Sequence, residues 1–134
     1  MANTTFSGPV RSENGFEQVT KNATTGAFTT SATYDATIIG GVQSLSGAGA
    51  VDLTNLITEL TTTGANALTL ADGTTSGQVK IVNMIVDGGD GTLTPVTFAN
   101  GTTITFDAVA ESVTLVWNST IGWVATSVQG ATIA

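Results

Sequence analysis

Carboxylates are the side chains in this sequence whose spacing comes closest to a catalytic arrangement. Two pairs stand out, Asp87 with Asp90 and Asp107 with Glu111, because glycoside hydrolysis uses two carboxyl groups, one of them a general acid. Each pair lies in a segment that we expect to be a solvated turn, where Asp is common for conformational reasons. We therefore expect these residues to shape turns, and we assign no catalytic residue.

The segment from Asp87 to Gly91 also alternates carboxylates with glycines, as calcium-binding loops do. It lacks the Glu that closes such loops and binds the ion through both oxygens, and it occurs once in the chain. Asp87 and Asp90 are therefore weak candidates for a metal site, and we expect no metal.

The sequence lacks the residues that most other catalytic and metal-binding sites require. The chain of 134 residues has no His and no Cys, which removes the usual ligands of zinc, copper and haem and the thiol nucleophile. Three basic residues against ten acidic ones give a net charge of −7, which argues against a nucleic-acid-binding surface. We expect no enzyme, no cofactor and no nucleic-acid partner.

Composition favours β-structure. The chain contains 27 Thr, and Thr, Val and Ile together make 48 of its 134 residues; these β-branched side chains suit a pleated sheet better than a helix. The longest apolar stretch, Ile81 to Val86, is far too short to span a membrane, and the first residues do not resemble a signal peptide. We expect a mainly β protein that is made in the cytoplasm and has no membrane partner.

Residues 1–36 differ from the rest. They contain no Leu and no Ile, and their few large apolar side chains follow neither a helical nor a strand period. Such a segment is either a disordered terminus or an extended arm whose side chains fill pockets on a partner. Pro9 favours the arm because it fixes one dihedral and lowers the cost of ordering. The candidate contact residues of the arm are Phe6, Pro9, Val10, Arg11, Phe16 and Phe28.

Residues 37–134 are predicted to form the β body. Its first part is ambiguous, because apolar residues fall at helical spacing behind a possible N-cap at Asp52, whereas the surrounding threonines disfavour a helix; we predict a strand. The residues at helical spacing are Leu53, Leu56, Ile57 and Leu60. The strands expected beyond them are 67–71, 78–86, 93–99, 102–107, 112–117 and 123–128. Turn residues every 8 to 12 positions predict an antiparallel β-sandwich or jelly-roll-like body.

Two hairpins can be examined for register. A three-residue turn over 99–101, with Gly101 left-handed, would pair Phe98 with Thr102 and keep the apolar residues on one face. This turn resembles the segment around Asp72-Gly73, but two copies are fewer than a solenoid needs.

In the second hairpin, a loop over 118–122 pairs Trp117 with Trp123 and places Val116 and Val124 together on the opposite face. Both faces of this hairpin are then apolar, so a second sheet or a second subunit must cover the outer one. We predict these four residues as a subunit interface.

Several segments together resemble small virion structural proteins of tailed bacteriophages. They are Phe6–Ser12, Leu60–Gly73, Gly77–Lys80, Asp87–Pro95, Thr102–Ala108, Ser112–Trp117 and Gly122-Trp123. The first is similar to the start of capsid-associated proteins from phages of marine bacteria. The resemblance implies a homotrimeric capsid decoration (cement) protein that binds the major capsid protein on the outer surface of the virion, or else the base of a head or tail fibre.

One further class stays open. A carbohydrate-binding or adhesive module would use exposed aromatic rings as stacking platforms, and the candidates are Trp117, Trp123 and Tyr34. Exposure of the two tryptophans would favour this class over a virion structural protein.

Overall fold

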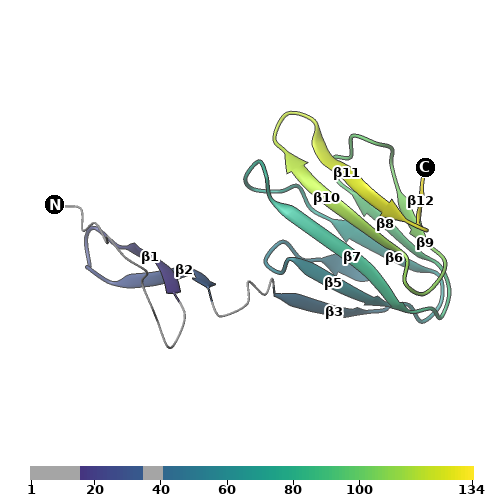
Figure 1. Ribbon diagram of the computed structural model, residues 1–134, viewed down its shortest axis with the longest axis horizontal. Coiled ribbons are helices and arrows are strands. Elements are labelled where there is room, and N and C mark those ends of the chain that lie inside the picture. Colours follow the sequence, from purple (N-terminus) through teal and green to yellow (C-terminus); the bar gives the residue numbers. More distant parts are fainter. Residues whose placement is uncertain (1–15, 35–40) are drawn as a thin grey trace, which may run out of the picture. The chain divides into compact units, whose positions relative to one another are not determined.

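The computed structural model describes residues 16–34 and 41–134, and every regular element in these ranges is a β-strand (Figure 1). Contacts divide the chain into two units, residues 1–39 and 40–134. The expected boundary after residue 36 falls among residues 35–40, outside the described ranges.

The first unit contains one antiparallel strand pair. Strand β1 (Phe16–Lys21) pairs with β2 (Phe28–Tyr34), and a bulge follows Gln18. The side chain of Asn22 closes the turn by accepting hydrogen bonds from the main-chain nitrogens of Thr24 and Thr25, at 2.8 and 2.9 Å. The described part of the predicted arm therefore folds back on itself.

The second unit consists of two five-stranded sheets stacked as layers (Figure 1). The first sheet, in the order β11-β10-β7-β5-β3, contains β3 (Val42–Ser46), β5 (Ile57–Thr61), β7 (Val79–Val86), β10 (Ser112–Asn118) and β11 (Gly122–Gln129). The second, in the order β12-β9-β8-β6-β4, contains β4 (Gly49–Val51), β6 (Asn66–Leu70), β8 (Gly91–Pro95), β9 (Ile104–Phe106) and β12 (Thr132–Ile133). The mainly β, sandwich-like body is confirmed.

The prediction of an antiparallel body is wrong for β3 to β8. Strands β3, β5 and β7 are parallel to one another in the first sheet, and β4, β6 and β8 are parallel in the second. The chain places each odd strand in one sheet and the next even strand in the other, so it coils through three turns. Strands joined directly never pair here, and neighbours in a sheet therefore run in the same direction.

Three arches carry the chain from the first sheet to the second, and they stack on one another. The nitrogen of Gly47 in the β3–β4 arch donates to the carbonyl of Thr61 at 2.9 Å. Thr62, in the next arch, donates from its nitrogen to the carbonyl of Val86 at 3.0 Å, and its Oγ1 accepts from the nitrogen of Gly88 at 2.9 Å. These bonds satisfy main-chain groups that lie outside the sheet ladders.

Alternate side chains of the strands point inward and form one core between the sheets. Its fully buried members from the coil and the later strands include Leu60, Leu68, Leu70, Val82, Met84, Leu93, Ile104, Phe106, Val113 and Leu115. Each such side chain contributes about 1.5–3 kcal/mol of hydrophobic stabilisation on burial. This core is complete within one copy of the chain.

The β10–β11 hairpin has the predicted register. Trp117 pairs with Trp123, Leu115 with Ala125, and Val116 with Val124. The two indole rings meet edge to face with centroids 5.4 Å apart, and the Trp123 Nε1 donates to the carbonyl of Ala71 at 2.9 Å. The ladder shifts by one residue after Thr114.

The predicted turn over 99–101 is wrong. Strand β8 pairs with β9 through Leu93 and Ile104, so the connection is a longer loop, and Gly101 does not have a positive φ. The loop bonds to other strands instead: Val96 donates to the carbonyl of Leu70, and Ala99 to that of Trp123, both at 2.9 Å. These bonds replace a tight hairpin.

The ambiguous segment around residue 57 is resolved. Ile57–Thr61 is strand β5 as predicted, whereas Leu53 and Leu56 lie in the turn before it. Asp52 does cap this turn, because its Oδ1 accepts from the nitrogens of Thr54 and Asn55 at 3.0 and 2.8 Å. An N-cap contact is therefore present without a helix behind it.

The stacking of the arches predicts the effect of one substitution. A Cβ on Gly88 would lie 2.5 Å from the carbonyl oxygen of Thr62, so Gly88→Ala must push two arches apart. We expect the free energy of unfolding to fall by about 1–3 kcal/mol in denaturant titration. Ser44→Ala, on the exposed side of β3, is the control and should change it by less than about 0.5 kcal/mol; equal effects would contradict tight stacking.

Candidate functional site: two outer faces and a buried polar cluster

Two of the four carboxylates considered for catalysis or metal binding accept hydrogen bonds within their own turns. Asp87 Oδ1 accepts from the nitrogen of Gly89 at 2.9 Å, and Glu111 Oε2 accepts from the nitrogen of Asp107 at 2.7 Å. Within residues 16–34 and 41–134, no three acidic, His or Cys side chains come together as a metal site. The expected turn role is therefore observed for Asp87 and Glu111.

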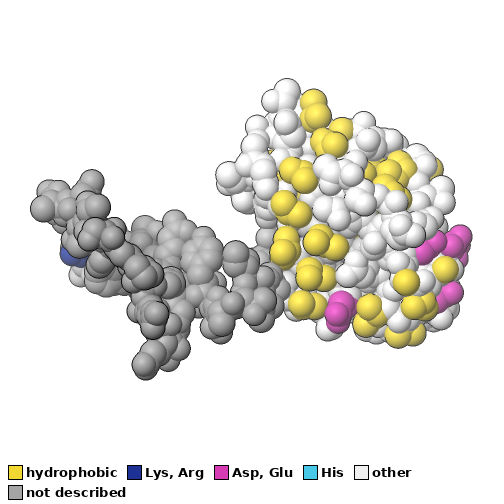
Figure 2. All heavy atoms as spheres, in the orientation of Figure 1, with side chains coloured by type: hydrophobic (Ala, Val, Ile, Leu, Met, Phe, Trp, Pro, Cys, Tyr) yellow, Lys and Arg dark blue, Asp and Glu magenta, His cyan; other side chains and the backbone are white. Residues whose placement is uncertain are grey.

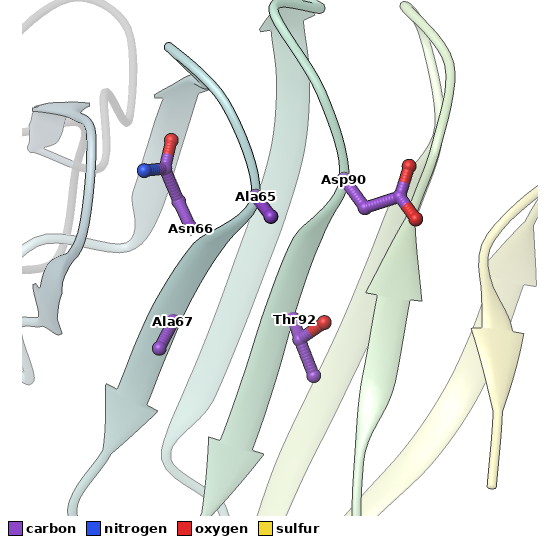
Figure 3. A pocket seen from close by; sticks show the side chains of 5 residues that line it. All are labelled: Ala65, Asn66, Ala67, Asp90 and Thr92. Atoms are coloured by element: carbon purple, nitrogen blue, oxygen red, sulfur yellow. The ribbon is translucent and has the colours of Figure 1, made fainter.

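A shallow hollow of about 210 Å³ lies beside Asp90 on the second sheet. Figure 3 shows Ala67 on β6 beside Thr92 on β8, with Ala65 and Asp90 just before these two strands and the Asn66 side chain directed away from Asp90. The Asn66 Oδ1 accepts from the nitrogen of Thr63 at 2.8 Å. One carboxylate and one hydroxyl at this hollow do not form the pair that acid–base catalysis of hydrolysis needs.

The outer face of the second sheet is neutral and rich in hydroxyl groups. Thr92, Thr105 and Thr132 lie in register across β8, β9 and β12, and Thr69 pairs with Thr94. None of the strands in this sheet contains a charged residue. This face is suited to contact with water.

The outer face of the first sheet is more apolar. Val42, Ile57 and Ile81 lie in one row across β3, β5 and β7, and Val79, Val116 and Val124 lie in a second row across β7, β10 and β11. We call these six residues the valine–isoleucine face. Figure 2 shows hydrophobic side chains gathered in a band on this side of the second unit. Val42 and Val79 are 46% and 37% exposed.

The predicted subunit interface is split by the fold. Trp117 and Trp123 are 7% and 0% exposed and belong to the core, whereas Val116 and Val124 belong to the valine–isoleucine face. An interface on this sheet would therefore use the valines and not the tryptophans. The same burial leaves neither tryptophan available as a platform for a sugar ring.

The arm residues are placed only in part. Phe16 and Phe28 begin β1 and β2. The predicted contacts Phe6, Pro9, Val10 and Arg11 lie outside the described residues, and so does the side chain of Tyr34.

Sequence reasoning missed a buried polar cluster around Lys80, the one basic residue of the second unit. Lys80 is 1% exposed. Its Nζ donates to the main-chain carbonyl of Asn55 at 2.9 Å and lies 3.6 Å from Asp52 Oδ1. The signal for this burial was its place on the inward side of β7, in alternation with Val82 and Met84.

Gln43 extends the cluster to the end of the coil. Its Oε1 accepts from the nitrogen of Asp52 and from Thr58 Oγ1, at 2.9 and 2.8 Å, and its Nε2 donates to the carbonyl of Ala50 at 2.8 Å. One amide thus joins β3, β4 and β5. Every buried side-chain nitrogen and oxygen in the described residues has a partner.

The cluster shifts the pKa values of its two charged groups. Burial lowers the pKa of Lys80, and the Asp52 carboxylate offsets part of this change. Burial alone would raise the pKa of Asp52, but the hydrogen bonds from Asn55 and the charge of Lys80 outweigh it and hold the pKa below 3.8. Asp52 is therefore ionised at neutral pH.

These shifts predict how stability depends on pH. Because the folded pKa of Asp52 is below 3.8, its value in the unfolded chain, its stabilising contribution is present above pH 3.8 and is lost as pH falls through the folded pKa. Asp52→Asn should lower the free energy of unfolding at pH 7 by roughly 1–3 kcal/mol, since Lys80 stays buried without its carboxylate. Denaturant titrations from pH 7 to pH 2 measure both effects. Asp90→Asn, at an exposed carboxylate, is the control, and an equal loss there would contradict the assignment.

No protein-family model matches the chain, and no curated protein matches it significantly. Within the described ranges, no helix has the length and apolar character to cross a membrane. The chemistry of the two outer faces is therefore the basis for a functional proposal.

Proposed function

We propose that this chain is a non-enzymatic structural protein of a tailed-phage virion, a homotrimer that decorates and stabilises the outside of the capsid. The observation that carries the proposal is the valine–isoleucine face. Six β-branched apolar side chains lie on the outside of a body whose core is already complete without them. Apolar patches of this kind on small proteins are typical of association surfaces.

A second copy of the chain is the partner that suits this face. The strands of the first sheet contain two charged residues, and only Glu59 points outward, since Lys80 is buried. A surface almost without charge favours the apolar contacts of an obligate homo-oligomer. The proposed number of copies, three, comes from the resemblance to virion structural proteins.

The charge of the body suits the outer surface of a capsid. Beyond residue 40 the chain has seven carboxylates and one lysine, so packaged nucleic acid would repel it. A protein that binds the assembled shell and not its separate subunits stabilises the shell by mass action. In this proposal the major capsid protein is the partner, and residues 1–36 supply the additional contacts through Phe6, Pro9, Val10 and Arg11.

A fibre base is the second candidate, since it would use the same trimer. A carbohydrate-binding module is less well supported, because the two tryptophans that would have favoured it are buried in the core.

The oligomeric state tests the proposed interface. Native mass spectrometry of the full chain should give three times its mass of 13.5 kDa. The double variant Val42→Asp and Val79→Asp should be monomeric, because charged side chains on both rows resist burial. The matched control, Thr69→Asp with Thr94→Asp on the second sheet, should remain trimeric. A monomeric wild type, or dissociation of both variants alike, would refute the interface.

Binding to shells tests the virion role. Capsids of the encoding phage, stripped of outer proteins, should recover resistance to heat when the wild-type protein is added back. A truncated chain lacking residues 1–15 should trimerise normally but bind the shell at least tenfold more weakly, since it lacks the four arm contacts outside the described residues. If the wild-type protein did not bind the stripped capsids, the decoration role would be refuted and the fibre base would remain as the candidate function.

A further inference from the structure

Three side chains with complementary reactivity meet at the end of the coil that lies opposite the arches. They are the amine of Lys80 on β7, and the carboxylate of Asp52 and the amide of Asn55 in the turn between β4 and β5. The amine lies 3.6 Å from Asp52 Oδ1, and Asn55 Nδ2 donates to Asp52 Oδ2 at 2.7 Å. One carboxylate therefore contacts both an amine and a side-chain amide.

We propose that Lys80 and Asn55 join in an intramolecular isopeptide bond, with Asp52 transferring the proton. The Nζ lone pair attacks Cγ of Asn55, the Nζ–Cγ bond forms, and the Cγ–Nδ2 bond breaks. Asp52 accepts a proton from the amine and delivers it to Nδ2, which leaves as ammonia. The reaction exchanges one amide for another, so it needs no oxidant, reductant or further reactant.

The surroundings of Lys80 favour this chemistry. The side chain is 1% exposed, and burial lowers its pKa, which makes the neutral, nucleophilic amine easier to reach. The carboxylate accepts a hydrogen bond from the nitrogen that leaves, so a proton that Asp52 has taken from the amine has a short path to that nitrogen. Reacting groups held together in a folded chain also avoid the entropic cost of a bimolecular encounter.

The turn holds the main chain of Asn55 against the amine. The Nζ donates to the main-chain carbonyl of Asn55 at 2.9 Å, so the amine already lies on the residue that it attacks. Rotation of the Asn55 side chain then has to bring Cγ to Nζ. A side chain at position 41 would overlap the Asn55 amide oxygen, and Gly41 leaves that space free.

The bond would tie β7 to the turn that precedes β5. The acid titration predicted for Asp52 persists in the cross-linked chain, because the main-chain hydrogen bonds from Thr54 and Asn55 remain. The contribution of the Lys80 charge to that titration disappears. This inference concerns the body alone and does not depend on the proposed virion role.

Intact mass and tryptic digestion of the denatured wild-type chain test the proposal. The mass should be lower than the sequence mass by one ammonia. The basic residues of the chain are Arg11, Lys21 and Lys80, so trypsin should leave 22–134 as one fragment, since an acylated Lys80 is not cleaved. A full sequence mass with cleavage after Lys80 would overturn the proposal and leave the amine as an ion-pair partner.

Variants assign the roles. Lys80→Met and Asn55→Ala should each show their full mass, and Asp52→Asn should show full mass with cleavage after Lys80 while retaining the wild-type circular dichroism spectrum. Asn83→Ala, on the outward side of β7, is the matched control and should still lose ammonia. Loss of ammonia in Lys80→Met would show that another reaction, such as succinimide formation, is responsible and would refute the cross-link.

Discussion

The alternation of consecutive strands between two facing sheets is the constraint on which the rest of this structure depends. Because β3 to β8 cross the core at each arch, strands adjacent in the chain cannot pair, and both sheets acquire a parallel half. The arches must then stack closely, which accounts for the approach of Gly88 to the carbonyl of Thr62. Strands β9 to β12 extend the two sheets through antiparallel pairs, and Phe106 and Trp123 complete the core from there.

Once inward side chains have filled the core, the outward ones decide what the body can contact. Threonines on the second sheet present hydroxyls to water, while the valine–isoleucine face presents methyl groups on an almost uncharged surface. The difference between the two faces is the physical reason for placing a partner on the first sheet. The buried cluster of Gln43, Asp52 and Lys80 belongs to a separate part of the body and ties the first turns of the coil together.

Much of the fold follows from local pattern. Strands β6, β7, β10 and β11 were predictable from alternation and from Asp-Gly and Asn-containing turns, and the β10–β11 register followed from loop length alone. The parallel pairing was not predictable from the sequence. It brings Val42, Ile57 and Ile81 into register across unequal lengths of chain, so it leaves no sequence repeat. The prediction of a tight turn at Gly101 was wrong because the main-chain nitrogens of Val96 and Ala99 form hydrogen bonds to distant strands. Lys80 alternates with core residues along β7, but only the fold brings Asp52 to it.

In the proposed assembly, further copies of the chain cover the valine–isoleucine face. Because the chain has no Cys, a single introduced Cys is the one thiol that a reagent can label, and its rate of labelling measures the exposure of that position. The most direct measurement compares the rates at which a thiol reagent labels the native variants Val42→Cys and Thr94→Cys, both at residues exposed in a single copy. We expect labelling to be at least tenfold slower at position 42 than at position 94, and the two rates to become equal once Val79→Asp separates the copies. Equal rates in the undisturbed protein would contradict the proposed assembly.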